Sequence, residues 1–301
     1  MDASSKKVIY AALVGNSLIA ITKFIAATIT GSSAMMSEGI HSLVDTGNQG
    51  LLLYGLKRAQ QPADEQFPFG HGKEIYFWSF VVALLIFALG AGISIYEGVH
   101  HILHPEPITS PLINYVVLGL AILFEGVAWW FAFTEFKKTK GKRSFVGAIR
   151  GGKDPTLFVV LFEDSAAMLG LIVAFVGIWL TQVTGILYFD GIASVIIGLI
   201  LALVAFWLAY ETKGLLIGES ARNEVVAGIR ALVSDYPEIE KVNEVLTMHM
   251  GPDFILVNIS ADFCGDIPIG RLETLSAELN QAIKQRFSKV RRVFIDARSS
   301  T

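Results

Sequence analysis

Long runs of apolar residues, separated by short polar connections, fill the chain up to about residue 213. Roughly 20 consecutive apolar residues are enough for a helix to cross a bilayer. The runs therefore predict an α-helical membrane protein whose first domain, residues 1–213, contains six transmembrane helices. The predicted helices are Val8–Thr30, Ala34–Leu56, Ile75–Gly98, Leu112–Phe136, Thr156–Val183 and Phe189–Tyr210.

After residue 213 the apolar positions recur over shorter stretches, with the periods of both helices and strands. Val242–Met250 and Phe254–Phe263 are predicted strands, because apolar residues alternate along the second of them. One helix is predicted before this pair and one after it, and Arg292–Arg298 is predicted as a last strand. This order indicates a small two-layer α+β domain over residues 214–301.

The composition supports a membrane protein and argues against some classes of partner and of metal site. Hydrophobic residues make up 53% of the 301 residues and charged residues 17%, whereas a soluble domain usually carries about 25% charged residues. The net charge of -3 is small, which argues against a nucleic-acid partner. The single cysteine, Cys264, excludes an intramolecular disulfide and a metal site built from several cysteines.

Basic residues are confined to one side of the predicted membrane. The connections after helices one, three and five contain no Lys or Arg, whereas the N-terminus and the connections after helices two and four contain several. The positive-inside rule then predicts that both termini, and the C-terminal domain, lie in the cytoplasm or its topological equivalent. The short loops and the lack of a transit-like leader favour a bacterial inner membrane.

The second predicted helix carries polar residues inside its apolar run. Glu38, His41, Asp45 and Asn48 are spaced by three, four and three residues, so they share one face of a helix. Ionisable residues inside a membrane are costly and usually functional. This face is therefore the first candidate for a functional site.

A histidine and a carboxylate on one helix face supply half of a tetrahedral zinc-type site. His41 and Asp45 stand in this relation, and Asp164 on the fifth predicted helix could complete the site from an opposing helix. The alternative is that these groups form a buried ion-pair network around Lys23. Three potential ligands on two helices favour the metal site.

Two further charged residues lie inside the predicted helices. Lys23 is expected to neutralise a buried carboxylate such as Glu163 or Asp190. Glu125 is expected to point inward, either behind the metal ligands or as a proton carrier. The residues alone do not choose between these two roles.

Two motifs resemble the cation diffusion facilitator family of divalent-metal transporters. They are His41-Ser-Leu-Val-Asp45 and Phe69-Gly-His71-Gly-Lys-Glu74. With the extension to Gln49 and the stretch Leu161–Gly170, the chain is similar to the zinc transporter nine subgroup of that family. The resemblance covers nearly the whole chain.

This resemblance implies six transmembrane helices, a cytoplasmic ferredoxin-like domain and a homodimer. It also implies proton-coupled export of metal by alternating access, with the metal held between helices two and five. Membrane lipid, protons and the transported cation are then the expected partners, and no prosthetic group is expected.

The resemblance carries over three ligand positions and leaves the fourth open. Positions that match family ligands are His41, Asp45 and Asp164. Val160 stands where the family usually has the fourth ligand, and a valine cannot bind a metal. Glu163 and Asn48 are the candidates to replace it, and water is a third possibility. An Asn ligand would favour harder cations such as manganese.

Other positions match family metal sites only in part. Asp64 and His71 match ligands in the connection after helix two, but Phe67 replaces a histidine, so a capped loop is the favoured interpretation. In the C-terminal domain, Asn243, Asn258 and Ile295 stand at the family's zinc-cluster positions, which predicts a dimerisation module with little metal sensing. His249 is expected at the surface or an interface. His100, His101 and His104 are expected to be solvated histidines at the outer membrane face, and a role in receiving exported metal or sensing pH is the alternative.

The sequence thus predicts a proton-coupled exporter of a divalent cation rather than an enzyme. Zinc is the first candidate, with manganese, cobalt or iron as alternatives. Two other classes stay open: a non-transporting metal-binding membrane regulator, and a membrane metal-dependent hydrolase in which the same residues activate water.

Overall fold

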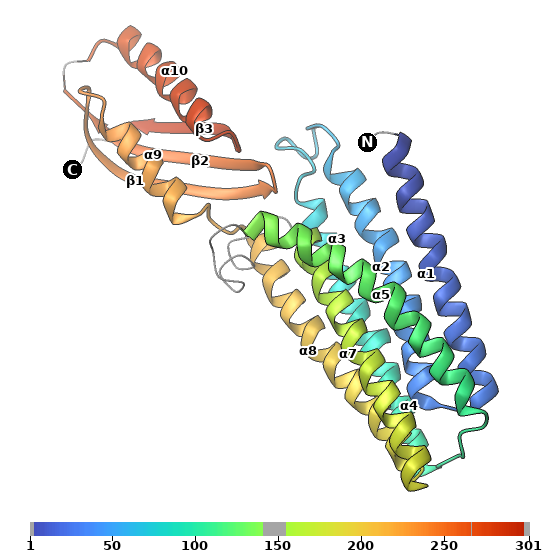
Figure 1. Ribbon diagram of the computed structural model, residues 1–301. Coiled ribbons are helices and arrows are strands. Elements are labelled where there is room, and N and C mark those ends of the chain that lie inside the picture. The colour runs from blue at the N-terminus through green and yellow to red at the C-terminus, as the bar shows by residue number, and fades with distance from the viewer. Residues whose placement is uncertain (1–2, 141–154, 266, 298–301) are drawn as a thin grey trace. The chain divides into compact units, whose positions relative to one another are not determined.

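The computed structural model describes residues 3–140, 155–265 and 267–297 (Figure 1). The chain divides into two compact units, which are described separately. The first unit contains the long helices. The second contains the C-terminal domain together with residues 58–76, which connect the second and third long helices.

The first unit consists of long helices that contain every predicted apolar segment. Their bounds are α1 (Ala3–Thr30), α2 (Ser33–Ala59), α3 (Glu74–Leu85), α4 (Gly92–Leu103), α5 (Pro111–Lys140), α7 (Pro155–Thr184) and α8 (Tyr188–Ile217). Figure 1 shows that these helices run side by side as a bundle.

Four helical segments in the described part of the chain are long and apolar enough to cross a membrane. They are Glu74–Leu103, Pro111–Thr134, Phe158–Thr184 and Tyr188–Ile217. The described apolar part of α1, Asn16–Thr30, is shorter, and polar residues interrupt the apolar run of α2. The helical architecture of a membrane protein is thus confirmed, while six spans remain a prediction.

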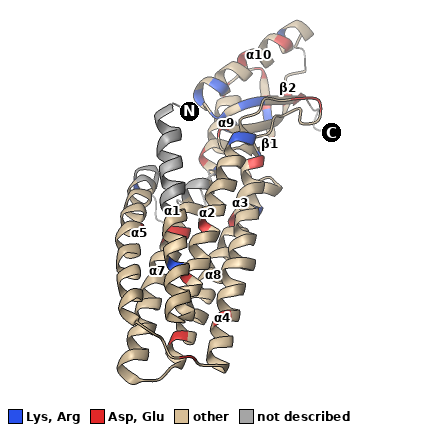
Figure 2. Cartoon of the chain, turned by 90° about the vertical axis from the view of Figure 1, so that its right-hand side faces the viewer, with Lys and Arg blue, Asp and Glu red and all other residues tan. Residues whose placement is uncertain are grey.

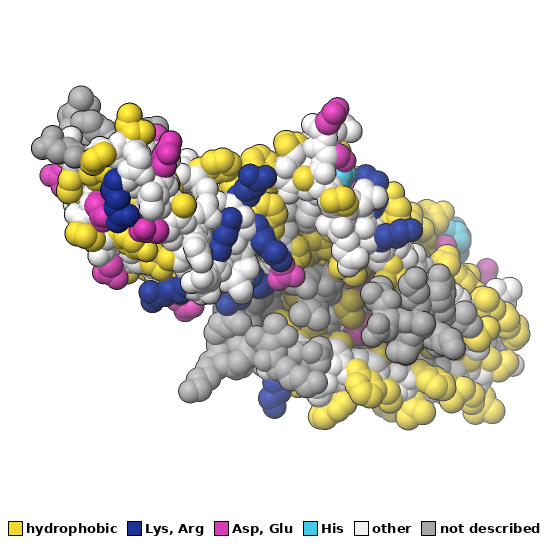
Figure 3. Space-filling view, turned by 90° about the horizontal axis from the view of Figure 1, so that it is seen from above, with side chains coloured by type: hydrophobic (Ala, Val, Ile, Leu, Met, Phe, Trp, Pro, Cys, Tyr) yellow, Lys and Arg dark blue, Asp and Glu magenta, His cyan; other side chains and the backbone are white. Residues whose placement is uncertain are grey.

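The outside of the helices is apolar, as a helix in contact with lipid requires. Phe131 on α5 and Phe206 on α8 are 69% and 72% exposed. Figure 3 shows hydrophobic side chains over the outer surface of the helices, and Figure 2 shows few charged residues along them. Such an extensive exposed apolar surface indicates contact with lipid.

A π-helical turn, η1 (Ile86–Ala91), joins α3 to α4 without a break. At its end the N–H of Gly92 donates to the carbonyl of Phe87, five residues earlier. This bond replaces the i to i−4 bond of an α-helix. The third predicted span is therefore one continuous helix with a wider turn in its middle.

Glycines allow α4 and α8 to approach closely. A β-carbon at Gly98 would lie 2.7 Å from the carbonyl oxygen of Gly191 and from the N atom of Val195. A β-carbon at Gly198 would lie 2.6 Å from Cγ1 of Ile95 on α4. Both distances are too short for a real side chain, so these positions fix the packing of the two helices.

The C-terminal domain has the predicted order of elements. These are α9 (Asn223–Ser234), β1 (Ile239–Gly251), β2 (Phe254–Phe263), α10 (Ile269–Arg286) and β3 (Val290–Ala297). The described strands form a sheet in the order β1-β2-β3, with β1 antiparallel and β3 parallel to β2. The parallel pair is possible because α10 returns the chain to the start of the sheet.

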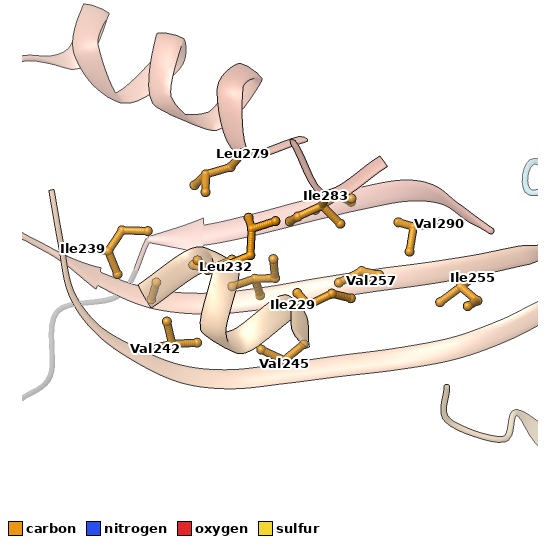
Figure 4. Packing of buried hydrophobic residues seen from close by; sticks show 14 of the residues in the cluster. Ile229, Leu232, Ile239, Val242, Val245, Ile255, Val257, Leu279, Ile283 and Val290 are labelled. Atoms are coloured by element: carbon orange, nitrogen blue, oxygen red, sulfur yellow. The ribbon is translucent and has the colours of Figure 1, made fainter. Parts of the chain in front are cut away.

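The core of this domain lies between the sheet and its two helices (Figure 4). Ile229 of α9 and Leu279 of α10 are fully buried. Along β2 the alternating residues Ile255, Val257 and Ile259 are buried, as the sequence pattern predicts. Fully burying one such side chain contributes about 1.5–3 kcal/mol.

His249 on β1 corrects one expectation, because its side chain is buried rather than at the surface. Its backbone N–H donates to the carbonyl of Glu219 at 3.0 Å, and the ring lies near the carbonyl of Gly251. The loop before the domain is thus held to the sheet at this point. A signal was present in the sequence, since His249 lies four residues after Val245 and the two-residue period of a strand places both on the same, buried face.

Candidate metal centre

The polar face of α2 points into the first unit. Glu38, His41 and Asn48 are buried, and Asp45 is partly exposed. Their spacing of three and four residues on one helix produces this alignment. The side chains that contact these four residues differ along the helix, so the four do not form a single site.

His41 and Asp45 form the centre of the candidate site. Nδ1 of His41 lies 3.4 Å from Oδ1 of Asp45. Neither ring nitrogen of His41 has a hydrogen-bond partner within the described residues, although the side chain is 1% exposed. Buried polar atoms are normally paired, so this imidazole has free bonding capacity that a metal ion could use.

Asp164 and Glu163 approach this pair from α7 in different ways. Asp164 is partly buried and close enough to interact electrostatically with Asp45. Glu163 is buried and accepts a 2.6 Å hydrogen bond from Nδ2 of Asn48. Over the described ranges, no three His, Cys, Asp or Glu side chains come together closely enough to hold a metal. The predicted ligand set His41–Asp45–Asp164 therefore stays a prediction.

The two candidates for the fourth ligand contact each other. The Asn48–Glu163 hydrogen bond joins α2 to α7 one turn beyond Asp45, while Val160 on α7 is partly buried. The bond uses Nδ2 of Asn48 and leaves its Oδ1, the atom that could bind a metal, buried without a hydrogen-bond partner among the described residues. The spacing of residues along the sequence does not predict this contact, because Asn48 and Glu163 lie on different helices.

Lys23 does not pair with Glu163 or Asp190, which corrects the expectation from sequence. Its Nζ donates to Glu38 Oε2 at 3.0 Å, to Ser42 Oγ at 2.8 Å and to Glu125 Oε1 at 2.9 Å. We call these four residues the lysine cluster. A buried ion-pair network around Lys23 thus exists, but it leaves out His41, Asp45 and Asp164.

Asp190 at the start of α8 has a different role. Its carboxylate accepts hydrogen bonds from Ser32 Oγ at 2.7 Å and from the backbone N–H of Ser33 at 2.6 Å, with the N–H of Ala34 at 3.4 Å. A carboxylate at a helix N-terminus satisfies N–H groups that lack a partner in the helix. Asp190 therefore ties the start of α2 to α8.

The three histidines at the end of α4 have different surroundings. His101 on α4 is buried with Nε2 3.7 Å from Oδ2 of Asp190. His100 and His104 are exposed, and their rings lie 4.9 Å apart. The expectation of solvated histidines thus fits His100 and His104 but is wrong for His101.

The connection between α2 and α3 is held by its own hydrogen bonds. Asp64 accepts from the N–H of Phe67 at 2.7 Å and pairs with Nε2 of His71 at 2.8 Å. The ring of Phe67 packs against that of His71, with the ring centres 4.6 Å apart and the planes tilted by 49°. The hydrogen bond from His71 lowers the pKa of the Asp64 carboxyl below its ordinary value. These contacts fit the capped-loop interpretation.

In the C-terminal domain, the side chain of Asn243 makes a hydrogen bond within the sheet. Its Nδ2 donates to Oδ1 of Asp262 across the β1–β2 pair at 2.8 Å. Glu238 pairs with Arg271, which lowers the pKa of the Glu238 carboxyl. The Glu238–Arg271 pair ties α10 to the start of β1.

Comparison with known proteins gives one family-model match and several relatives. Residues 9–217 match the family model of the cation efflux transmembrane domain. The human "Proton-coupled zinc antiporter SLC30A9, mitochondrial" is 34% identical over 263 residues, which are 87% of this chain and 46% of the human protein.

Two other relatives come from a plant and a bacterium. The Arabidopsis thaliana "Metal tolerance protein C4" is 29% identical over 270 residues, 89% of this chain and 59% of the plant protein. The Bacillus subtilis "Manganese efflux system protein MneP" is 20% identical over 302 residues, 97% of this chain and 95% of that protein. The chain thus spans about half the length of the human and plant relatives.

Proposed function

The chain belongs to the cation efflux family, and on that premise we propose that it exports a divalent cation across a membrane in exchange for protons. The relatives are named as an antiporter, a tolerance protein and an efflux system. These names support a transporter without enzymatic activity.

The observation that carries the proposal is the His41–Asp45 pair on α2. A buried imidazole with no hydrogen-bond partner in the described part of the chain, next to a carboxylate, is costly unless it binds something. Asp164 on α7 is the proposed third ligand, and the Asn48–Glu163 contact lies directly beyond. Movement between α2 and α7 would then open and close the site.

Competition between metal and proton supplies the coupling. An imidazole must be neutral and a carboxylate ionised to bind a metal. Metal entering from the cytoplasmic side would displace protons from His41 and the carboxylates. Protons arriving from the other face would displace the metal after the site has opened there. This cycle gives antiport by alternating access.

Zinc is the proposed cation, because an imidazole with carboxylates suits zinc. The name of the human relative mentions zinc and that of the Bacillus relative manganese. Manganese, cobalt and iron are therefore the competitors to test. A side-by-side flux measurement with the four metals ranks them.

A flux assay in liposomes tests the proposal. The purified chain is reconstituted, a zinc reporter is enclosed, and uptake is followed with and without a pH gradient. We expect the gradient to accelerate uptake, and His41→Ala or Asp164→Asn to reduce it at least about tenfold. Thr181→Val is the matched control, since Thr181 is buried on α7 and its hydroxyl donates, among described residues, only to the carbonyl of Gly177 in the same helix.

The outcomes separate the candidate functions. A rate of zinc uptake that is the same with and without the pH gradient, with no movement of protons, would contradict antiport. Tight zinc binding without any flux would favour the metal-binding regulator. Normal flux in His41→Ala would show that the metal binds elsewhere.

Orientation and assembly belong to the same proposal. We propose six spans, both termini in the cytoplasm, a bacterial inner membrane and a homodimer formed through a ferredoxin-like C-terminal domain. Cys264 is the only cysteine of the sequence and is exposed, so a membrane-impermeant maleimide reports its side. Labelling in inside-out vesicles but not in intact cells is expected, and mass measurement in detergent tests the dimer.

A further inference from the structure

A histidine and a carboxylate come together a second time, at the end of the first unit where α2 and α8 begin. We propose that His101 on α4 and Asp190 on α8 form a second divalent-cation site, which binds the metal after it leaves the His41–Asp45 pair. This inference rests on the proposed export function, but the second site shares no residue with the metal centre or the lysine cluster. Burial, distances and available ligand atoms support it.

His101 offers a buried nitrogen that no protein group uses. The residue is 7% exposed, and its Nε2 is buried without a hydrogen-bond partner among the described residues. Buried polar atoms in proteins are normally paired. The ring nitrogens of His41 lack partners in the same way within the described ranges. His101 can therefore bind a metal without breaking a contact of the protein.

The distance between His101 and Asp190 suits a shared ion better than a direct hydrogen bond. Nε2 of His101 lies 3.7 Å from Oδ2 of Asp190, whereas an N–H···O hydrogen bond is usually about 2.9 Å long. Two ligand atoms of a tetrahedral zinc ion, each about 2.0–2.1 Å from the metal, are about 3.3 Å apart. The His41–Asp45 pair, at 3.4 Å, has nearly this separation. A small shift of one side chain would let His101 and Asp190 bind one ion.

Asp190 keeps bonding capacity and uncompensated charge. An ionised carboxylate has about four acceptor sites, and its contacts with Ser32 Oγ and the N–H groups of Ser33 and Ala34 use three of them. The side chain is 0% exposed. In the described part of the chain, its partner that can carry positive charge is His101. A divalent cation would compensate the buried negative charge.

Close packing of α4 against α8 holds the two ligands in place. Gly191 follows Asp190 directly. A β-carbon at Gly191 would lie 2.8 Å from the carbonyl oxygen of Gly98 and from Cγ1 of Ile102. These two residues lie on either side of His101 along α4. The helix contact therefore fixes His101 relative to Asp190, as a preorganised metal site requires.

Ser33 on α2 is the proposed third ligand. Its backbone N–H donates to Oδ2 of Asp190, and its Oγ is buried without a hydrogen-bond partner among the described residues. Water would complete a tetrahedral shell, as it does in open zinc sites. An imidazole nitrogen among the ligands favours zinc and similar transition metals over magnesium and calcium, which prefer oxygen ligands alone.

Hydroxyl groups link the second site to the metal centre. Ser37 precedes His41 by one turn of α2, and its hydroxyl contacts that of Ser194 on α8. The hydroxyl of Ser194 donates to the carbonyl of Ser94 on α4 at 2.9 Å. Ser33 and His41 are eight residues apart, or about 12 Å along the helix, so one ion cannot occupy both sites. A cation passes from one to the other when Ser37 and Ser194 separate.

Zinc binding to the full chain in detergent tests the site without relying on transport. His41→Ala disables the metal centre, and calorimetry measures the zinc affinity that remains. Adding His101→Gln should weaken one zinc site at least about tenfold, because even changes behind a ligand cost about 10–100-fold. Adding His100→Gln instead is the control. His100 is exposed on the same helix, so its replacement should leave the affinity unchanged.

A cysteine at position 101 gives a positive signal that does not depend on a loss of binding. Cys264→Ser first removes the native thiol. In that protein, His101→Cys should produce the ultraviolet charge-transfer band of a cadmium thiolate when cadmium is added, because thiolates bind soft divalent metals. A further Asp190→Asn change should weaken cadmium binding. Thr181→Cys, at a buried position of α7, is the control and should give no band.

The outcomes separate this site from the export function. The inference is overturned if His101→Gln leaves the zinc affinity unchanged, if His100→Gln removes the zinc site instead, or if folded His101→Cys gives no cadmium band. Proton-coupled zinc flux in wild type together with any of these results would refute the second site alone. Wild-type protein that binds zinc at both sites but moves none in liposomes would refute the export function instead.

Discussion

Replacing Asp190 by alanine should weaken the attachment of α2 to α8. The carboxylate accepts hydrogen bonds from Ser32 Oγ and the N–H of Ser33 at 2.7 and 2.6 Å, and it is 0% exposed. Hydrogen bonds to charged groups contribute about 1.5–3 kcal/mol each. The two short bonds together therefore stabilise the junction by about 3–6 kcal/mol. The more distant N–H of Ala34 adds little.

A shift of the melting temperature should report this loss. One kcal/mol moves the midpoint by about 2–4 °C for a chain segment of 150–250 residues, so Asp190→Ala is expected to melt at least about 6 °C below wild type. Melting is followed in detergent by intrinsic fluorescence. An Asp190→Ala protein that melts within about 2 °C of wild type would refute the reasoning.

Graded variants separate the hydrogen bonds from the loss of side-chain volume. Asp190→Asn keeps one acceptor oxygen and the shape, so its effect should lie between wild type and alanine. Ser32→Ala removes the bond to Asp190 and also the 3.2 Å bond that Ser32 Oγ accepts from the N–H of Met35, so it should cost at least about half as much as Asp190→Ala. Equal effects of Asn and Ala would mean that the charge, rather than the number of acceptors, dominates.

Three further predictions concern other parts of the chain. Gly98→Leu should overpack the α4–α8 contact, lower stability by about 1–3 kcal/mol and slow zinc flux, whereas Gly119→Leu, where a β-carbon meets no atom within 4 Å, should do neither. Leu279→Ala should cost about 2–5 kcal/mol, seen as earlier unfolding of the C-terminal domain in hydrogen exchange. Because the bond from His71 lowers the pKa of Asp64, protection of the loop from proteolysis should be full above the ordinary carboxyl pKa and fall as pH drops through the folded value. Asp64→Asn should remove that dependence on pH.

The elements of the fold follow from local signals in the sequence. Apolar runs and alternating strands are set by residues close in the chain, so the helices and the order α9-β1-β2-α10-β3 could be predicted. The position of η1 could not, because a π-helical turn depends on how α3 and α4 fit against neighbouring helices.

The candidate site was predictable only along α2. The shared face of His41 and Asp45 follows from the helical repeat, but the partners of Lys23 and Glu163 depend on the rotation and depth of helices far apart in sequence. Lys23 on α1 reaches Glu125 on α5, 102 residues away. Such long-range pairing leaves no trace in the spacing of residues, so the sequence points Lys23 to other carboxylates than the ones it contacts.

The π-helical turn η1 determines which residues of α4 meet α8. Each residue advances an α-helix by about 100°, so removing one residue from Ile86–Ala91 would turn everything after it by about that angle. Gly98 would then rotate away from Gly191, and His101 away from Asp190. A π-helical turn contains one residue more than the α-helical turn it replaces. In this chain that residue sets the rotation of α4 about the helix axis relative to α3. Relatives that lack this residue would need their small residues at different positions to keep the same helix contact.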